Sequence, residues 1–194
     1  MKLLFATQNK NKVDEIKRLI GAQHELLTLA DFDYEEELQE SSLLLEENAL
    51  EKANHIYHEF KMNCFSEDTG LEIDFLNGAP GALSARYAGE EKDADQNMNK
   101  ILKELNGIAN RKARFRTVIA LVIDGKEFLY EGFINGTITT EKRGTNGFGY
   151  DPIFQPEGSA KTFAEMNADE KSAISHLARA FAKMKEFLES EFAE

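Results

Sequence analysis

Two adjacent acids, Glu67 and Asp68, follow a short apolar run and precede Thr69-Gly70-Leu71. Mg²⁺ binds to one or two protein carboxylates together with phosphate oxygens and water. A carboxylate at such a place also orients or deprotonates an attacking water. Glu40 and the pair Glu46-Glu47 lie upstream and offer a further carboxylate. The pattern indicates metal-assisted hydrolysis, with plain solvation as the competing interpretation because the chain has 35 acidic residues.

A polar segment joins the first predicted strand to the first predicted helix. It contains Thr7, Gln8, Asn9, Lys10, Asn11 and Lys12. The backbone N–H groups and the dipole of a helix start favour a phosphate, and hydroxyl, amide and lysine side chains add donors and charge. The segment is not a P-loop, because the glycines of that pattern are absent. Ordinary helix capping is the alternative interpretation.

A third motif combines glycines with aromatic rings between Gly144 and Phe154. Glycine lets the backbone approach a ligand closely, and an aromatic ring stacks on a planar base. Downstream, Lys171 and His176 lie in a predicted helix, where either could donate a hydrogen bond to a base carbonyl. A lone histidine in a helix is more often structural than functional.

A fourth segment, residues 77–89, contains three glycines, a proline and a run of small residues. Its sequence, Asn-Gly-Ala-Pro-Gly-Ala-Leu-Ser-Ala-Arg-Tyr-Ala-Gly, predicts a tight, close-packed loop that a merely solvated surface does not require.

The elements that must position these motifs follow from apolar periodicity. Residues 2–6 read as a buried strand rather than a signal peptide. Helical spacing of apolar residues then predicts a helix that ends near Gly21, a second helix over about 43–60 and a third near 93–105. Two further strands are predicted at 25–29 and at 63–66, the latter ending at Glu67-Asp68, with a loop over 31–42.

The second half carries the clearest strand, residues 114–123, followed by the hairpin signal Asp124-Gly125. Residues 127–133 are expected to pair back antiparallel, and residues 136–143 to continue the meander. One helix is expected over about 168–190. Strand–helix units at the start and a hairpin in the middle predict a mixed α/β protein.

The bulk numbers exclude several classes of function. The net charge of −12 argues against nucleic-acid binding, which needs a basic surface. No apolar run approaches the roughly 20 residues that span a bilayer, and the single cysteine, Cys64, forms no internal disulfide. With 194 residues the chain fits one large domain or two lobes that share a core. We therefore expect a cytoplasmic protein with no membrane partner.

Taken in order, these motifs resemble the inosine triphosphate pyrophosphatase family, and the resemblance covers essentially the whole chain. The matching segments are Ala6-Thr7-x-Asn9-x-x-Lys12-x-x-Glu15, Glu47-Asn48-Ala49 with Lys52-Ala53, Glu67-Asp68-Thr69-Gly70-Leu71, Asn77-Gly78-Ala79-Pro80-Gly81, Ser84-Ala85-Arg86-Tyr87, Gly147-Phe148-Gly149-Tyr150-Asp151-Pro152-Ile153-Phe154, Lys161-Thr162, Glu170-Lys171 and Ser175-His176.

The resemblance implies one pyrophosphatase domain over residues 1–194, with a partly antiparallel central sheet flanked by helices and two lobes around an active-site cleft. It implies a cytoplasmic homodimer that hydrolyses ITP, dITP or XTP to the monophosphate and pyrophosphate with Mg²⁺. Asp68 would be the catalytic and metal-binding carboxylate, assisted by Glu40 and Glu67. The substrate would be held by Thr7, Gln8, Asn9, Lys10, Asn11, Lys12, Lys52, Thr69, Phe148, Gly149, Tyr150, Asp151, Lys171 and His176.

One position departs from the family. After Ser175-His176 the family usually has arginine, whereas this chain has Leu177 on the apolar stripe of the predicted last helix. Arg179 lies three residues after His176, on the same face of that helix. Our hypothesis is that Arg179 partly replaces the missing donor. A pyrophosphatase of different base specificity and a non-catalytic nucleotide-binding protein are the alternatives.

Overall fold

The computed structural model describes residues 1–21 and 24–191, which form two compact units. Unit 1 comprises Met1–Asp68, Thr117–Gly132 and Leu177–Glu194, and unit 2 comprises Thr69–Arg116 and Phe133–His176. Three strands, β3 (Cys64–Ile73), β5 (Lys112–Ile123) and β6 (Lys126–Ile138), run from one unit into the other. None of the described helices is long and apolar enough to cross a membrane.

The strands form a mixed, seven-stranded sheet in the order β2-β1-β3-β5-β6-β7, with β4 paired to β3. Strand β1 (Lys2–Phe5) pairs parallel with β2 (Glu25–Thr28) and with β3. Strand β4 (Pro80–Gly81) pairs antiparallel with β3, and β7 (Phe154–Pro156) antiparallel with β6. The mixed α/β class expected from the sequence is confirmed.

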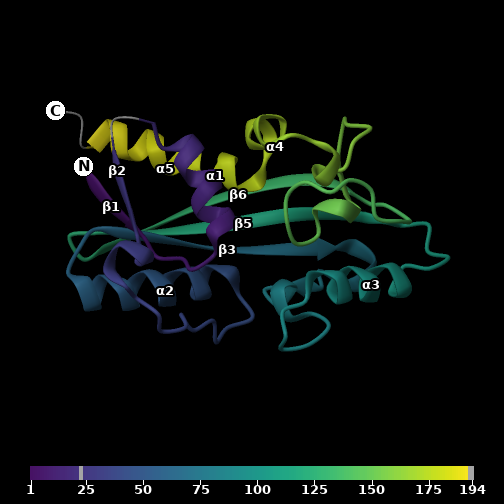
Figure 1. Cartoon of the computed structure of the whole chain (residues 1–194), viewed down its shortest axis with the longest axis horizontal. Coiled ribbons are helices and arrows are strands. Elements are labelled where there is room, and N and C mark those ends of the chain that lie inside the picture. Colours follow the sequence, from purple (N-terminus) through teal and green to yellow (C-terminus); the bar gives the residue numbers. More distant parts are fainter. Residues whose placement is uncertain (22–23, 192–194) are drawn as a thin grey trace. The chain divides into compact units, whose positions relative to one another are not determined.

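Unit 1 places helices on both faces of its strands (Figure 1). Helix α1 (Lys10–Leu19) and helix α5 (His176–Glu191) lie on one face, and α2 (Leu45–Phe60) lies on the other. The core on the α1 and α5 face is a cluster that includes Phe65, Leu177 and Phe181. A short 3₁₀ turn, η1 (Leu29–Phe32), follows β2.

Unit 2 is built around its own apolar cluster. Leu71 and Ile73 of β3 pack there with Ile101 of α3 (Ala94–Glu104). Unit 2 also contains helix α4 (Ala168–Ile174). The described residues of the unit include four 3₁₀ turns. The turns are η2 (Asp74–Leu76), η3 (Ser84–Arg86), η4 (Asp151–Ile153) and η5 (Phe163–Glu165).

Most element predictions are confirmed, including the helices near 93–105 and 43–60 and the hairpin between β5 and β6. Its turn residues Asp124 and Gly125 both have positive φ, at 49° and 75°. Positive φ at both central residues is the geometry of the two-residue type I′ turn.

Strand β3 does not end at Glu67-Asp68, as the sequence predicted, but continues to Ile73. The continuation is stabilised by β4, because Leu71 pairs with Gly81 and is fully buried. A Cβ atom at Gly70 would lie 2.7 Å from the Gly81 carbonyl oxygen, so only glycine allows this close pairing. The two acids therefore lie inside a strand rather than after it.

Two further predictions were wrong. Residues 136–143 do not form a new strand, because Gly136–Ile138 completes β6 and pairs with β7 instead. The last helix is also interrupted at Ser175, whose ψ of 154° is extended. The stripe on which we based one helix serves two cores: Ile174 packs against the unit 2 cluster, whereas Leu177 belongs to the unit 1 cluster.

Candidate functional site

The predicted phosphate-binding segment connects β1 to α1 in unit 1. Asn9 is the N-cap of α1, and its Oδ1 accepts hydrogen bonds from the backbone N–H groups of Asn11 and Lys12, at 3.0 and 3.3 Å. The Thr7 Oγ1 accepts one from the Asn9 N–H at 3.2 Å. The Asn9 side chain therefore caps helix α1, as the alternative interpretation of this segment expected. This capping is compatible with phosphate binding, because the positive end of the α1 dipole still lies at this loop.

The other members of this segment differ in their surroundings. Gln8 Nε2 donates to the Glu36 carbonyl oxygen at 2.9 Å, so Gln8 links the segment to the loop after η1. Lys10 and Asn11 are exposed, whereas Lys12 is buried. Of the two lysines that the sequence offered for phosphate, only Lys12 is held in one place by surrounding protein.

Beside this segment, unit 1 contains a group of polar side chains, buried except for the partly exposed Glu40, that we call the carboxylate cluster. Its members are Lys12, Glu40, Asn48, Lys52, Glu67 and Asp68. Lys12 Nζ lies 3.1 Å from Glu67 Oε2, and both side chains are less than 10% exposed. Lys52 Nζ donates to Glu40 Oε1 at 2.5 Å and to the Glu67 carbonyl oxygen at 2.7 Å.

The alternation of β3 separates the two adjacent acids of this cluster. Successive side chains of a strand point to opposite faces of the sheet. Glu67 pairs with Lys12 of α1, whereas Asp68 Oδ2 accepts a hydrogen bond from Asn48 Nδ2 of α2 at 2.9 Å. Because α1 and α2 lie on opposite faces of the unit 1 strands (Figure 1), the two carboxylates have different partners.

The pKa of Asp68 is raised to about 7, mainly by burial. The charges of Glu40 and Glu67 act in the same direction, whereas Lys52 and the hydrogen bond from Asn48 act against it. Burial opposes the charge of Lys52, but Glu40, Glu67 and Asp68 outweigh it, so its pKa lies above the ordinary value. The cluster therefore combines a lysine that stays protonated with a carboxylate that exchanges a proton near neutral pH.

Unit 2 contains the aromatic glycine motif. We use the name base-side cluster for Phe148 and Asp151 of this motif together with Lys171 and His176, which follow it in the chain. Lys171 Nζ lies 2.7 Å from Asp151 Oδ2 and 4.4 Å from the centroid of the Phe148 ring. The same Asp151 oxygen accepts a hydrogen bond from the Phe148 backbone N–H at 3.0 Å. Asp151 and Lys171 are almost fully buried, and Phe148 is half-buried.

Glycine is required in the backbone turn that carries Phe148. Gly147 has a φ of 73°, and a Cβ atom there would lie 2.0 Å from Asp151 Oδ2. Gly149 also has a positive φ, 61°. The glycines thus let Asp151 lie directly beneath the turn that carries Phe148.

His176 is the first residue of α5, so it does not share a helix with Lys171, which lies in α4. Its ring stacks on Phe115 with centroids 4.7 Å apart and planes inclined by 17°, and it is 5% exposed. Stacking of this kind fixes the orientation of the imidazole.

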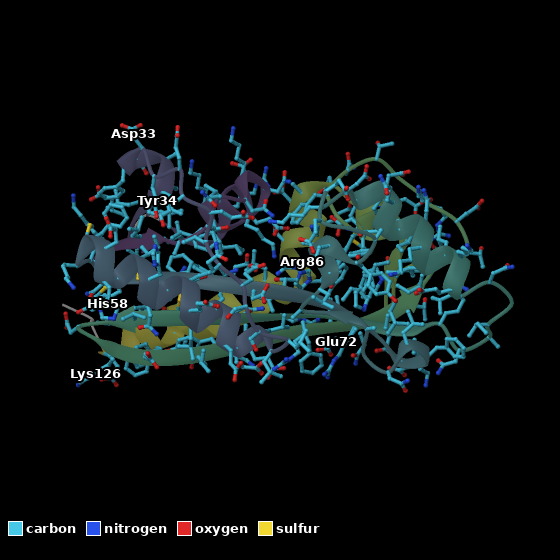
Figure 2. All side chains as sticks on the ribbon, turned by 90° about the horizontal axis from the view of Figure 1, so that it is seen from below. Asp33, Tyr34, His58, Glu72, Arg86 and Lys126 are labelled. Atoms are coloured by element: carbon cyan, nitrogen blue, oxygen red, sulfur yellow. The ribbon has the colours of Figure 1, made fainter. Side chains whose placement is uncertain are left out.

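Tyr150, a predicted substrate contact, is an anchor in the structure. Its hydroxyl donates to the Ser84 carbonyl oxygen at 2.6 Å, and burial raises its pKa. This bond connects the aromatic glycine motif to η3. The same turn contains Arg86, which is labelled in Figure 2. Asn97 of α3 holds the same loop through the Ala85 carbonyl oxygen at 2.8 Å and the Ala88 N–H at 2.6 Å. The tight loop predicted at 77–89 is confirmed.

Three further positions complete the comparison with the sequence. Thr69 follows Asp68 in β3 and is half-buried. Leu177 is fully buried in the unit 1 core, so the residue after His176 offers no donor. Arg179 is exposed on α5.

Asn48, which donates a hydrogen bond to Asp68, is a residue of the carboxylate cluster that we did not predict from the sequence. A signal was present, since Asn48 and Lys52 lie one helical turn apart among the buried apolar residues of α2, Leu45, Ala49, Ala53 and Ile56. A polar side chain within a buried stripe needs partners, and polar groups on a common turn of a helix share neighbours.

Comparison with known proteins agrees with the fold and the motifs. The sequence profile of the Ham1 family matches residues 3–187. A Flavobacterium johnsoniae protein named dITP/XTP pyrophosphatase is 47% identical over 188 residues, which cover 97% of this chain and 98% of that protein. A Bacillus licheniformis protein of the same name is 43% identical over 191 residues, covering 96% and 97% of the two chains.

Solved structures are similar over nearly the whole chain. The Staphylococcus aureus Ham1 protein superimposes with a TM-score of 0.89 at 33% identity, covering 98% of this chain and all of that one. A Mycobacterium abscessus protein described as a nucleoside-triphosphatase and dITP/XTP pyrophosphatase gives a TM-score of 0.77 at 40% identity, covering 95% and 98%. The profile match and the full-length identities show that this chain belongs to the Ham1 family.

Proposed function

We propose that residues 1–194 act as one domain that hydrolyses non-standard purine nucleoside triphosphates, dITP, ITP and XTP, to the monophosphate and pyrophosphate. The names of relatives at 42–48% identity support the reaction. The observation that carries the proposal is the buried Asp68, whose pKa of about 7 suits a group that takes a proton from water at neutral pH.

The residues present fit a divalent metal ion such as Mg²⁺. Asp68 and Glu40 are carboxylates close enough to interact electrostatically, since the pKa of Asp68 is raised first by burial and also by the negative charge of Glu40. Within residues 1–21 and 24–191, no three His, Cys, Asp or Glu side chains form a ready-made metal site. Mg²⁺ needs only one or two carboxylates when phosphate oxygens and water complete its shell.

We assign Asp68 and Glu40 to the metal ion and Glu67 to Lys12. Glu67 lies on the other face of β3 and is already paired with that lysine. A bound Mg²⁺ would neutralise charge on the triphosphate oxygens. Glu67 instead fixes Lys12 next to the N-terminus of α1.

The chemistry assigned to the chain's own residues is a water attack at the α-phosphorus. The water oxygen forms the new P–O bond, the bond to the leaving pyrophosphate breaks, and Asp68 accepts the proton of the attacking water. Lys12 and Lys52, with the N-terminus of α1, stabilise the negative charge of the triphosphate. The phosphate segment Thr7–Lys12 holds the phosphates during the step.

We propose that the base-side cluster selects the base. Phe148 offers a ring face for stacking, and Lys171 and His176 supply donors toward the 6-oxo group of hypoxanthine or xanthine. Adenine has an amino group there, so two donors would face each other unpaired. A polar mismatch of this kind discriminates by about 10⁴ or more. Since guanine also has a 6-oxo group, its exclusion depends on the 2-position.

Arg179 is proposed to supply the donor that Leu177 lacks. Replacing Arg179 by alanine is then expected to raise the KM for ITP, with kcat little changed. Unaltered kinetics for ITP in this variant would remove Arg179 from the base side.

We also propose that the protein is a homodimer in the cytoplasm, as the family resemblance implies. Light scattering of the purified protein at micromolar concentration measures the mass directly. A mass of about twice the chain's 21.9 kDa supports the dimer, and a mass equal to one chain contradicts it.

The reaction is tested by measuring pyrophosphate and orthophosphate release from dITP, XTP, dATP and dGTP with Mg²⁺. Release of pyrophosphate from dITP and XTP, without orthophosphate and with little turnover of dATP, is the expected result. Orthophosphate release would indicate attack at the γ-phosphorus. Preference for dATP or dGTP would indicate a different base specificity.

A further inference from the structure

Asn48 connects two parts of the carboxylate cluster through a single side chain. Its Oδ1 accepts a hydrogen bond from the Ser42 N–H at 2.9 Å. Its Nδ2 donates to the Ser42 carbonyl oxygen at 3.1 Å and to Asp68 Oδ2 at 2.9 Å. Asn48 is fully buried in the first half of α2. One amide therefore holds both the backbone before α2 and the carboxylate on β3.

The backbone that Asn48 holds belongs to the segment carrying Glu40. Residues 40–44 contain no helix or strand, so their position depends on side-chain bonds. Glu51 Oε2 accepts hydrogen bonds from the Ser41 N–H and hydroxyl at 3.1 and 2.9 Å, and the Ser42 hydroxyl donates to Glu47. Of these residues, Asn48 alone also bonds to Asp68.

Only an amide of this length satisfies the three bonds. The site requires one acceptor and two donors, which asparagine provides and an ionised aspartate does not. Alanine at this position would leave the Ser42 N–H and carbonyl oxygen without these bonds and would remove a charge-assisted bond to Asp68. The contribution of Asn48 therefore lies in the geometry of the two carboxylates rather than in contact with substrate.

We propose that Asn48 is a positioning residue that fixes Asp68 and Glu40 relative to each other and thereby sets the affinity of the site for a divalent cation. The inference rests on the proposed function for the roles of these two carboxylates. Removing a partner that orients a metal ligand typically costs about 10–100-fold in metal affinity or activity.

The test compares wild type, Asn48→Ala and Ser42→Ala. Ser42→Ala is the matched control, because it removes the hydroxyl that bonds Glu47 and the Leu44 N–H but keeps both backbone groups that bond Asn48. Mn²⁺ binding without nucleotide is measured by electron paramagnetic resonance, and kcat and KM are measured with dITP and Mg²⁺. Thermal melting by circular dichroism checks that each variant is folded.

For Asn48→Ala we expect the Mn²⁺ dissociation constant to rise and kcat to fall, each by about 10–100-fold, with the KM for dITP within about threefold. Ser42→Ala should stay within about threefold of wild type in all three quantities. Asn48→Asp keeps the volume and the acceptor for Ser42 but loses the donor to Asp68, so its kcat should fall at least as far. It replaces Asn48→Ala if the latter does not fold.

Wild-type Mn²⁺ affinity and kcat in Asn48→Ala would overturn the inference, as would equal losses in Asn48→Ala and Ser42→Ala. Absence of Mn²⁺ binding in wild type would overturn it as well. Failure of the proposed function looks different: wild type then releases no pyrophosphate from dITP, while the Mn²⁺ dissociation constants still decide the role of Asn48.

Discussion

The carboxylate cluster of unit 1 and the base-side cluster of unit 2 are both largely buried, but different interactions hold them together. The first contains three carboxylates and two lysines, arranged by ion pairs and by the amide of Asn48. The second contains the ion pair Lys171–Asp151, whose lysine lies near the rings of Phe148 and Phe163. Dense charge suits phosphates and a cation, whereas one fixed donor beside a ring face suits recognition of a base.

This difference implies a division of labour. Under the proposed function, the carboxylate cluster would contact features that every nucleoside triphosphate shares, so its loss should reduce turnover of all substrates. The base-side cluster would contact the feature that distinguishes them, so its loss should reduce selectivity. The predictions below test that division.

The largest effect is expected for Lys52→Met. The substitution removes the cation that Glu40, Asp68 and the Glu67 carbonyl share. Breaking a buried pair by removing one partner destabilises a protein by about 3–5 kcal/mol. We expect a comparable loss in urea unfolding and a fall in kcat of about 100-fold or more with every triphosphate. A stable variant with normal kcat would contradict the assignment of Lys52.

The second prediction concerns the ion pair of the base-side cluster. Lys171→Met should destabilise the fold, because it removes the cation that pairs with the buried carboxylate of Asp151. It should also reduce kcat/KM for dITP by about 10–100-fold through loss of a charged donor.

A double variant separates these two effects. Adding Asp151→Asn to Lys171→Met removes the buried charge and should recover much of the lost stability in urea unfolding, without recovering kcat/KM for dITP. Recovery of both would mean that Lys171 acts only by stabilising the fold.

The third prediction uses the pKa of Asp68 in the metal-free protein. Burial is the main cause that raises this pKa to about 7 in the folded state, from an ordinary value of 3.8. The unfolded chain therefore loses this proton at lower pH than the folded chain, and stability falls as pH rises from about 4 to about 7. Asp68→Asn removes that loss, which is on the order of a few kcal/mol because each pKa step of one is worth about 1.4 kcal/mol.

Urea unfolding of wild type and Asp68→Asn at pH 5 and pH 8, with a chelator present, measures this difference. The advantage of Asp68→Asn should be small at pH 5 and larger at pH 8, and Mg²⁺ should reduce it by stabilising wild type. An advantage that does not depend on pH would show that Asp68 keeps an ordinary pKa.

The smallest effect concerns Cys64, which lies on the same face of β3 as Asp68. Its Sγ is 3.2 Å from the Ala53 carbonyl oxygen, and burial raises its pKa to about 12. We expect no alkylation by iodoacetamide at pH 8 in the folded protein and full alkylation in urea. Rapid alkylation without urea would show that the face of β3 beneath α2 admits water.

Apart from Asn48, the sequence predicted which residues of the carboxylate cluster would lie near the site, but not which side chain pairs with which. Periodic apolar residues located α2 and so the buried Lys52, and the polar segment before α1 located Lys12. The ion pairs of both lysines join residues 55 and 12 positions apart, which local patterns do not encode. The opposite directions of Glu67 and Asp68 were missed because we expected β3 to end before them.

The hydrogen-bond partners of the residues in the aromatic glycine motif could not be predicted from the sequence either. Phe148, Tyr150 and Asp151 lie within four consecutive residues and matched one family motif, yet Tyr150 donates a hydrogen bond to Ser84 while Asp151 pairs with Lys171. Those partners depend on φ values at Gly147 and Gly149 that turn the chain between them. The interruption at Ser175 was missed for a related reason, since one apolar stripe serves two separate cores.

The division of labour is tested most directly by the ratio of kcat/KM for dITP to that for dATP, measured as pyrophosphate release in wild type, Asp68→Asn and Lys171→Met. Asp68→Asn, assayed at high enzyme concentration, should lower both values together and leave the ratio within about threefold of wild type. Lys171→Met should lower the ratio by about 10-fold or more, since only the oxo base loses a donor. An unchanged ratio in Lys171→Met, or a changed ratio in Asp68→Asn, would contradict the account.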